Sequence, residues 1–343
     1  MTVLGILWFI LIAVLIAGYF ILDGFDLGSG VLSPFAAKDE KEKAIVRRSI
    51  GPVWDGNEVW LLTAGGALFA AFAPAYATTF SGFYLAIMLV LFGLIVRAVS
   101  LEYRAHDPKW KKLWDALFFI GSLLPALLFG VAIGNVYAGI PMDANGDYNG
   151  IPLLGLITPF TLLCGLLGLS FFLMQGATWL AMKAPKPSAF QARLAGLRRP
   201  LALVSLVLFA AVTAYALVGI QPTMDPALEI IRWLVFILVA AALIGAIVTS
   251  KTEGNDLLPF IFSSAAALFL VVLFAASMFP NLVVASATSI GESITIANAA
   301  SSDLALGWMT GITCVGLPLV LIYHVIIYRT FRGRITDEDL SEY

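Results

Sequence analysis

The chain has 343 residues, of which 60% are hydrophobic and only 12% are charged, and its net charge is −2. Soluble domains carry roughly 25% charged residues, so this composition, with a mean hydropathy of +0.95, excludes a soluble globular protein. The sequence predicts an all-α polytopic membrane protein.

Apolar runs follow one another along the whole chain. A membrane-spanning helix needs about 20 mostly apolar residues, and nine runs are long enough. Because the connections are short, we expect antiparallel bundles within a single transmembrane domain, 1–343. In chain order, the predicted helices are 3–32, 51–74, 78–102, 113–138, 152–181, 199–221, 227–250, 257–284 and 303–328.

Positive charge is concentrated in alternate connections. All but two of the 20 Lys and Arg residues lie in the segments 38–48, 104–112 and 183–199, at position 251 or in the tail 329–334. Cytoplasmic loops carry such an excess, which predicts an outer N-terminus and a cytoplasmic C-terminus. This topology accounts for the basic loops, so we expect no nucleic-acid partner. The other connections carry acids: Asp143, Asp147, Asp225, Glu229 and Glu292.

Five charged residues lie at similar depth inside the first three predicted spans, and Glu102 sits near the inner end of the third. Asp23 and Asp26 are three residues apart, as are Asp55 and Glu58, and Arg97 lies in the inner half of the third span. Residues at this spacing share a helix face. A hairpin of the first two spans would bring the two pairs together. Clustered carboxyl groups in a low dielectric are not all ionised at once, and mixed protonation is what a proton relay requires.

The competing interpretation is that these acids are hydrogen-bonded packing groups. It is strongest for Asp55 and Glu58, which lie within two turns of the cytoplasmic end. A charged side chain at bilayer depth costs about 3 kcal/mol, so Asp23 and Asp26 with Arg97 favour a functional role. Gly24 and Gly28 form a small-xxx-small pair, which lets another helix approach closely in either case.

Candidate ligands for a redox centre are scarce. The only histidines are His106, expected in a solvated loop, and His324, expected at the interface near the end of the last span. Membrane haem proteins hold iron through paired His or His and Met, and neither histidine has such a partner at helical spacing. Cys164 and Cys314 are expected to be buried core residues, and Met278 a core methionine. We therefore expect no metal, no bound cofactor and no catalytic residue in this chain.

Several stretches resemble subunit II of cytochrome bd-type quinol oxidases. They are LDGFDLGSG (22–30), the long stretch GPVWDGNEVWLLTAGGALFAAFAPAYATTFSGFYLAIML (51–89), GSLLPALLFGVAIGNV (121–136), QGATWLAMK (175–183), MFPN (278–281) and FRGRITDEDL (331–340). The resemblance extends from residue 18 to the C-terminus. It departs from the family at the short connection between 199–221 and 227–250, where members carry longer insertions.

This resemblance implies a part in a bacterial complex that takes electrons from quinol and reduces dioxygen to water. Haem b, haem d and the quinol site would then reside in a haem-bearing subunit I, the expected heterodimer partner. The resemblance also suggests a small accessory subunit, membrane lipid and quinone as partners, and it places the complex in the bacterial cytoplasmic (inner) membrane.

The resemblance also implies roles for individual residues. Asp26 and Asp55 match aspartates associated with proton uptake from the cytoplasm towards the haems. Asp23, Glu58 and Arg97 sit in the same motifs or at a matching place. Trp60 matches a tryptophan at the mouth of an oxygen conduit, and Trp54 is its upstream neighbour at the conduit or interface.

Two other functions remain open from the sequence. A proton-coupled secondary transporter would also use membrane acids and an arginine. Such transporters usually show internal repeats and helices broken near the midplane, and no clear repeat is present. The third hypothesis is a purely structural assembly subunit.

Overall fold

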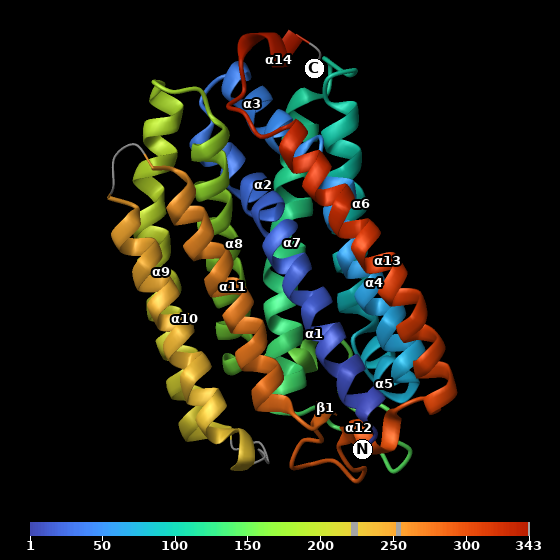
Figure 1. Cartoon of the computed structure of the whole chain (residues 1–343). Coiled ribbons are helices and arrows are strands. Elements are labelled where there is room, and N and C mark those ends of the chain that lie inside the picture. The colour runs from blue at the N-terminus through green and yellow to red at the C-terminus, as the bar shows by residue number, and fades with distance from the viewer. Residues whose placement is uncertain (221–225, 252–254, 342–343) are drawn as a thin grey trace.

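Long helices run between two ends of the molecule, and short elements cap those ends (Figure 1). The computed structural model describes residues 1–220, 226–251 and 255–341. The helices are α1 (Val3–Leu22), α2 (Gly24–Ala36), α3 (Glu40–Ile50), α4 (Trp54–Ala71), α5 (Ala73–Gly82), α6 (Tyr84–Tyr103), α7 (Lys111–Ala138), α8 (Pro159–Lys183), α9 (Ala189–Gly219), α10 (Glu229–Thr249), α11 (Leu257–Met278), α12 (Ile296–Ala299), α13 (Asp303–Thr330) and α14 (Asp337–Ser341). Single 3₁₀ turns cover Leu154–Leu156 and Pro226–Leu228, and β1 (Asn281–Val283) pairs antiparallel with β2 (Ile294–Thr295).

The two ends of the bundle carry different elements. α3 and α14 lie at one end, and the N-terminus, α12 and β1 lie at the other (Figure 1). We call the first the basic end, because α3, the ends of α6, α8 and α13, and the starts of α7 and α9 bring the Lys- and Arg-rich segments together there. That the basic end faces the cytoplasm remains a prediction from charge.

Within the described residues, eight segments are long and apolar enough to cross a membrane, and α1 with α2 forms the first of them. α4 is not one of the eight, because its first two turns contain Asp55, Asn57 and Glu58. Nine spans therefore remain a prediction. α8 is the most enclosed segment, whereas only 6% of the apolar window of α13 is buried, so α13 lies on the outside of this chain.

Several predicted boundaries are corrected. The predicted span 3–32 is interrupted at Asp23 and extends to Ala36, and the predicted span 78–102 divides into α5 and α6. The predicted helices 152–181 and 257–284 are shorter in the structure, as α8 and α11, and 183–198 is largely the start of α9 rather than a loop. Residues 221–225 of the short connection after 199–221 lie outside the described residues.

One cysteine also differs from its expected place. Cys164 is buried, as predicted, but Cys314 is exposed on the outer surface of α13. An apolar run indicates contact with something apolar, and for a membrane helix this can be lipid or another subunit as well as the core of its own chain.

The contact between α2 and α8 depends on glycine. A Cβ on Gly28 would lie 1.8 Å from the carbonyl oxygen of Phe172, and one on Gly176 would lie 2.4 Å from the carbonyl carbon of Gly28. The two backbones are therefore in direct contact, which is what the small-xxx-small spacing favours. This contact fixes the start of α2, where Asp26 lies, against the most enclosed helix.

Replacing Gly28 by Ala is expected to push α2 away from α8 and to destabilise the protein by about 1–3 kcal/mol, the usual range for overpacking a tight contact. The matched control is Gly196→Ala in α9, where a Cβ meets nothing within 4 Å. Thermal unfolding of the purified protein should show a lower midpoint for Gly28→Ala alone. Equal midpoints for the two variants would contradict this account of the contact.

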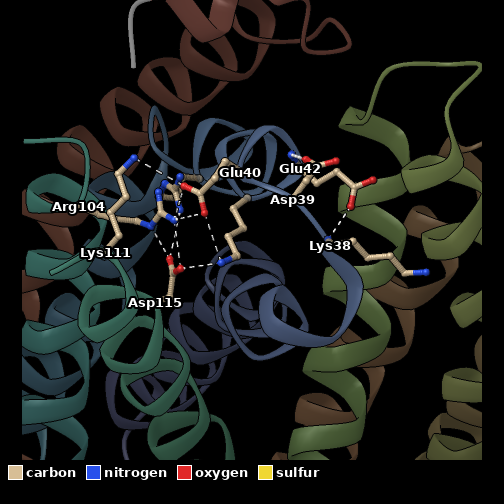
Figure 2. Close-up of polar contacts among 9 residues, drawn as sticks. Lys38, Asp39, Glu40, Glu42, Arg104, Lys111 and Asp115 are labelled. Atoms are coloured by element: carbon tan, nitrogen blue, oxygen red, sulfur yellow. Dashed lines mark hydrogen bonds and ion pairs between the residues drawn. The ribbon is translucent and has the colours of Figure 1, made fainter. Parts of the chain in front are cut away.

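A charge cluster fixes α3 to α6 and α7 at the basic end (Figure 2). Arg104 donates from Nη2 to Glu40 at 2.9 Å and from Nε to Asp115, and Lys43 donates to Asp115 at 2.9 Å. Partial burial raises the pKa of Glu40, but the hydrogen bond and charge of Arg104 outweigh it, and the pKa is lowered overall. Lys111, also drawn in Figure 2, lies 3.7 Å from Glu40.

A second cluster joins the C-terminal segment to the start of α11. Asp256 accepts from Arg198 at 2.8 Å and from Arg334 at 2.5 Å, and Lys186 lies 3.4 Å away. Arg334 also donates to the carbonyl of Ala184 at 2.6 Å. Burial raises the pKa of Asp256, but the hydrogen bond and charge of Arg198 outweigh it and lower the pKa.

Replacing Asp256 by Asn is expected to cost about 3 kcal/mol of stability, because Arg198, only 3% exposed, would remain charged and buried without its partner. Lys186→Met is the control: that side chain is 39% exposed, and exposed pairs contribute about 0–1 kcal/mol. A thermal midpoint no lower for Asp256→Asn than for Lys186→Met would contradict this prediction. Because the folded-state pKa is depressed, the contribution is present above the ordinary value of 3.8 and is lost as the pH falls below it.

Candidate functional site

The break between α1 and α2 places two aspartates in the interior. α1 ends at Leu22, Asp23 donates its backbone N–H to the carbonyl of Tyr19, and α2 begins at Gly24. Asp23 and Asp26 are both 0% exposed, which requires compensating partners because an isolated buried charge is very costly. These partners come from α4 and α6.

Arg97 of α6 provides the compensating charge. Its Nη2 donates to Asp23 Oδ1 at 2.7 Å and to Glu58 Oε1 at 2.5 Å. Arg97 is 0% exposed, whereas the Glu58 side chain is 26% exposed. The guanidinium therefore joins an acid sealed in the interior to one that reaches the surface of this chain.

Asn57 of α4 connects Asp26 to α13. Its Nδ2 donates to Asp26 Oδ2 at 2.7 Å and to the carbonyl of Leu22 at 3.0 Å. Its Oδ1 accepts from the hydroxyl of Tyr328 at 2.9 Å. Because the two amide hydrogens and the oxygen all have partners, the orientation of the amide is determined. We refer to Asp23, Asp26, Asn57, Glu58 and Arg97 as the inner cluster.

The predicted meeting of the two acid pairs occurs in part. Asp23, Asp26 and Glu58 come together through Arg97 and Asn57, but Asp55 is exposed and its Oδ1 accepts from the N–H of Gly56 at 2.7 Å. Asp55 lies at the first turn of α4, one turn before Glu58 and on the same helix face. These two acids therefore lead from the inner cluster to the surface.

Trp60 and His324 hold α13 against the bundle. Trp60 is buried and donates its indole N–H to Nε2 of His324 at 3.1 Å, while Nδ1 of His324 lies 2.8 Å from the carbonyl of Val320. Because a carbonyl only accepts and an indole N–H only donates, His324 is the neutral tautomer protonated at Nδ1. His324 is thus buried, whereas the sequence predicted that it lies at the membrane interface. Trp54 is partly buried and packs against a core at the basic end.

His324 does not fit the role of a haem ligand. Both of its ring nitrogens are already in hydrogen bonds, and His106 is exposed, with Nδ1 3.1 Å from the carbonyl of Glu102. Met278 is 2% exposed within the core, as expected. Among the described residues, no group of three or more His, Cys, Asp or Glu side chains is arranged to hold a metal ion.

Several buried polar atoms around the inner cluster have no hydrogen-bond partner among the described residues. They belong to residues that are 0% exposed: Asp23 Oδ2, Asp26 Oδ1, Ser29 Oγ, Arg97 Nε and Nη1, and both amide atoms of Gln175. Buried polar groups are usually satisfied by protein or by ordered water. The inner cluster therefore has unused hydrogen-bonding capacity for water.

Sequence reasoning missed Asn57, Tyr328 and the role of His324. Asn57 lies between Asp55 and Glu58, two residues that were predicted to belong to the site. This position was the one feature of the sequence that could have indicated its role. Tyr328 and His324 are four residues apart on α13 and share a face. Their partners lie more than 260 positions earlier in the chain, and no local pattern indicates them.

The fold and site define a class: a polytopic helical membrane protein that seals a carboxylate–guanidinium cluster inside its bundle. Residues 4–331 match the family model described as cytochrome bd terminal oxidase subunit II. The chain belongs to this family. It is a multi-pass protein of the bacterial inner membrane and a subunit of a quinol oxidase complex.

Individual relatives agree with this assignment. The chain is 36% identical to cytochrome bd-I ubiquinol oxidase subunit 2 of Escherichia coli strain K12, over 99% of this chain and 97% of that protein. It is 34% identical to cytochrome bd ubiquinol oxidase subunit 2 of Bacillus subtilis strain 168, over 98% of each chain. A chain of the bd oxidase from Geobacillus thermodenitrificans has the same fold, with a TM-score of 0.77, 15% identity, and coverage of 96% of this chain and 99% of that one.

These comparisons confirm the resemblance in the sequence and the all-α membrane fold. They also favour the oxidase over a proton-coupled transporter, because the match covers nearly the whole chain. The roles of the individual acids and tryptophans remain predictions.

Proposed function

We propose that this chain is the non-haem subunit of a quinol:oxygen oxidoreductase and carries protons from the cytoplasm to its partner's oxygen chemistry. In this proposal the haem-bearing subunit I holds haem b and haem d, which supply the electron transfer and oxygen reduction, and it also holds the quinol site. The residues of this chain bind, orient and move protons. Reduction of dioxygen to water consumes protons as well as electrons, so the complex needs a proton path to the site of oxygen reduction.

The observation that carries the proposal is the asymmetry around Asp26. Its Oδ2 accepts from Asn57 at 2.7 Å, whereas its Oδ1 is buried and has no hydrogen-bond partner in the part of the chain that the structure describes. In this proposal the proton resides on Oδ1, and Asn57 keeps the other oxygen engaged so that the carboxyl cannot rotate. Arg97 donates to both Asp23 and Glu58 and so connects the acid sealed in the interior to the acid that reaches the surface.

Glu58 and Asp55 are the proposed exit. Both lie on one face of α4 and reach the surface of this chain, so a proton leaving Asp26 has acceptors leading outward to a neighbouring subunit.

The oxygen-conduit role of Trp60 belongs to the same proposal. Dioxygen is apolar, and Trp60 is buried against α1, where a Cβ on Gly18 would lie 2.2 Å from its ring.

The experiment that tests this proposal is quinol-driven oxygen consumption by the purified complex carrying Asp26→Asn. The reduced-minus-oxidised spectrum of the same preparation reports whether its haem content is normal. Slow turnover with normal haem is the expected result, and either unchanged turnover or loss of haem removes the relay role.

A further inference from the structure

A cavity of about 170 Å³, with charged and polar residues in its wall, opens at the basic end. Its walls come from four places: the turn between α3 and α4, the end of α8, the end of α13 and the C-terminal segment 331–339. Ser49, Val53, Trp179 and Lys183 are buried wall residues. One water molecule occupies about 30 Å³ of liquid, so the cavity has room for several.

The cations in this wall have partners. Lys183 donates to the carbonyl of Phe331, Arg334 donates to Asp256 at 2.5 Å, and Arg48 lies 3.7 Å from Asp339. Their charges are therefore directed at carbonyl and carboxylate groups of this chain. This arrangement favours a water-filled chamber over a binding site for an anion.

Tyr328 connects the cavity to the inner cluster. It lines the cavity, and its hydroxyl donates to Asn57 Oδ1 at 2.9 Å, while Asn57 donates to Asp26 at 2.7 Å. One tyrosine and one amide thus separate the chamber from the buried carboxyl. The amide positions Asp26, because an asparagine side chain has no acidic proton to pass on at neutral pH.

Ser29 offers another polar position on this side of α2. Ser29 and Asp26 are three residues apart and share a helix face. Ser29 Oγ and Asp26 Oδ1 are both buried and have no hydrogen-bond partner within residues 1–220, 226–251 and 255–341. The adjacent Phe25 packs against Tyr328 and Trp179, with ring centroids 6.5 and 4.1 Å apart, and both partners line the cavity. Water that passes Tyr328 therefore has two unsatisfied oxygens to bind.

We propose that the cavity beneath the C-terminal segment is the aqueous entrance through which protons reach Asp26, with Tyr328 at its inner wall. This inference rests on the proposed proton-carrying function. It adds the place where the proton enters and a positioning pair, Tyr328 and Asn57, that orients the receiving carboxyl.

To test this proposal, the cavity is blocked in the intact two-subunit complex. Gly333 lines the cavity, is exposed, and a Cβ there meets nothing within 4 Å, so Gly333→Cys can be labelled with a bulky sulfonated methanethiosulfonate. Cys314→Ser is the background, because Cys314 is exposed. The control is Lys112→Cys, exposed at the same end but outside the cavity wall.

After complete labelling, we expect oxygen consumption to fall at least about fivefold in Gly333→Cys, with recovery on reduction of the mixed disulfide. Labelled Lys112→Cys should retain the rate of the background complex. If fully labelled Gly333→Cys loses no activity, the proposal that protons enter through this cavity is overturned. An equal loss of rate in both labelled variants overturns it as well. The proposed function is judged separately by Asp26→Asn, which involves no label.

A second variant tests the inner wall. Tyr328→Phe keeps the ring and removes only the hydroxyl, and we expect turnover to fall about fivefold with a larger H₂O/D₂O rate ratio and unchanged haem content. Tyr323→Phe, on the same helix but exposed, should match wild type in all three measurements. A wild-type rate and isotope ratio in Tyr328→Phe would overturn the role of this residue.

Discussion

Oxygen reduction by the complex is expected to slow about a hundredfold when Asp26 is replaced by Asn, while the haem content stays normal. A positioned proton donor or acceptor contributes typically 10²–10⁴-fold. Asn has the shape of Asp and can still accept from Asn57 through its carbonyl oxygen. The substitution therefore removes the proton-carrying group and preserves packing around a residue that is 0% exposed.

The control for Asp26→Asn is Glu102→Gln. Glu102 is an exposed acid at the end of α6 and lies outside the inner cluster, so this variant should retain the wild-type rate. Oxygen uptake with saturating quinol and a reduced-minus-oxidised spectrum on the same sample are the two measurements. If Asp26→Asn turns over at the wild-type rate, the acid is a packing group, which is the competing interpretation of the sequence.

Arg97→Leu is expected to prevent normal assembly. Its guanidinium is the charge partner of Asp23, which is 0% exposed, and breaking a buried pair by removing one member costs about 3–5 kcal/mol. Folded domains are stable by only about 5–15 kcal/mol, so we expect a severalfold lower yield of intact complex from membranes. Haem content per membrane protein, with quantitative immunodetection of this chain, measures that yield.

The double variant Arg97→Leu with Asp23→Leu tests whether Arg97 affects the yield of the complex through its charge or through its packing. Removal of both members of a buried pair leaves no uncompensated charge between them, so the yield should recover most of the way. Arg97→Lys is the second comparison. It keeps the charge but replaces the planar guanidinium, whose Nη2 donates to both carboxylates, by a flexible ammonium group, and we expect an intermediate yield. A double variant no better than Arg97→Leu alone would show that Arg97 acts through packing rather than charge.

The acids and the arginine of the site could be predicted from the sequence, and its asparagine, tyrosine and histidine could not. Asp23, Asp26 and Arg97 stand out because charge inside a membrane is rare and costly, and the shared depth of these residues indicated a meeting point. Asn57, Tyr328 and His324 carry no charge and are common near helix ends. Their importance depends on the packing of α13 beside α4, which brings together residues more than 260 positions apart.

Helix α3 was not predicted as a helix from the sequence. Its basic residues indicated a cytoplasmic loop, yet Asp39 accepts from the N–H of Glu42 at 2.8 Å and Glu42 accepts from Lys38 at 2.7 Å. Asp39 is therefore the N-cap of the helix, and Glu42 accepts from the backbone N–H of Lys38, the residue before the cap. Val46 and Ile50 are buried beneath the helix. The positive charge of such a segment predicts the side of the membrane on which it lies, but it does not predict whether the segment is helical.

We propose that Asp26 carries protons for a reaction that takes place in the partner subunit. A single-turnover reaction of the fully reduced complex with dioxygen tests this role most directly, with a pH-indicator dye to follow proton uptake and absorbance to follow haem oxidation. In Asp26→Asn, we predict that proton uptake slows by the same factor as steady-state turnover, whereas the initial binding of oxygen keeps its wild-type rate. Proton uptake at the wild-type rate in that variant would contradict the claim.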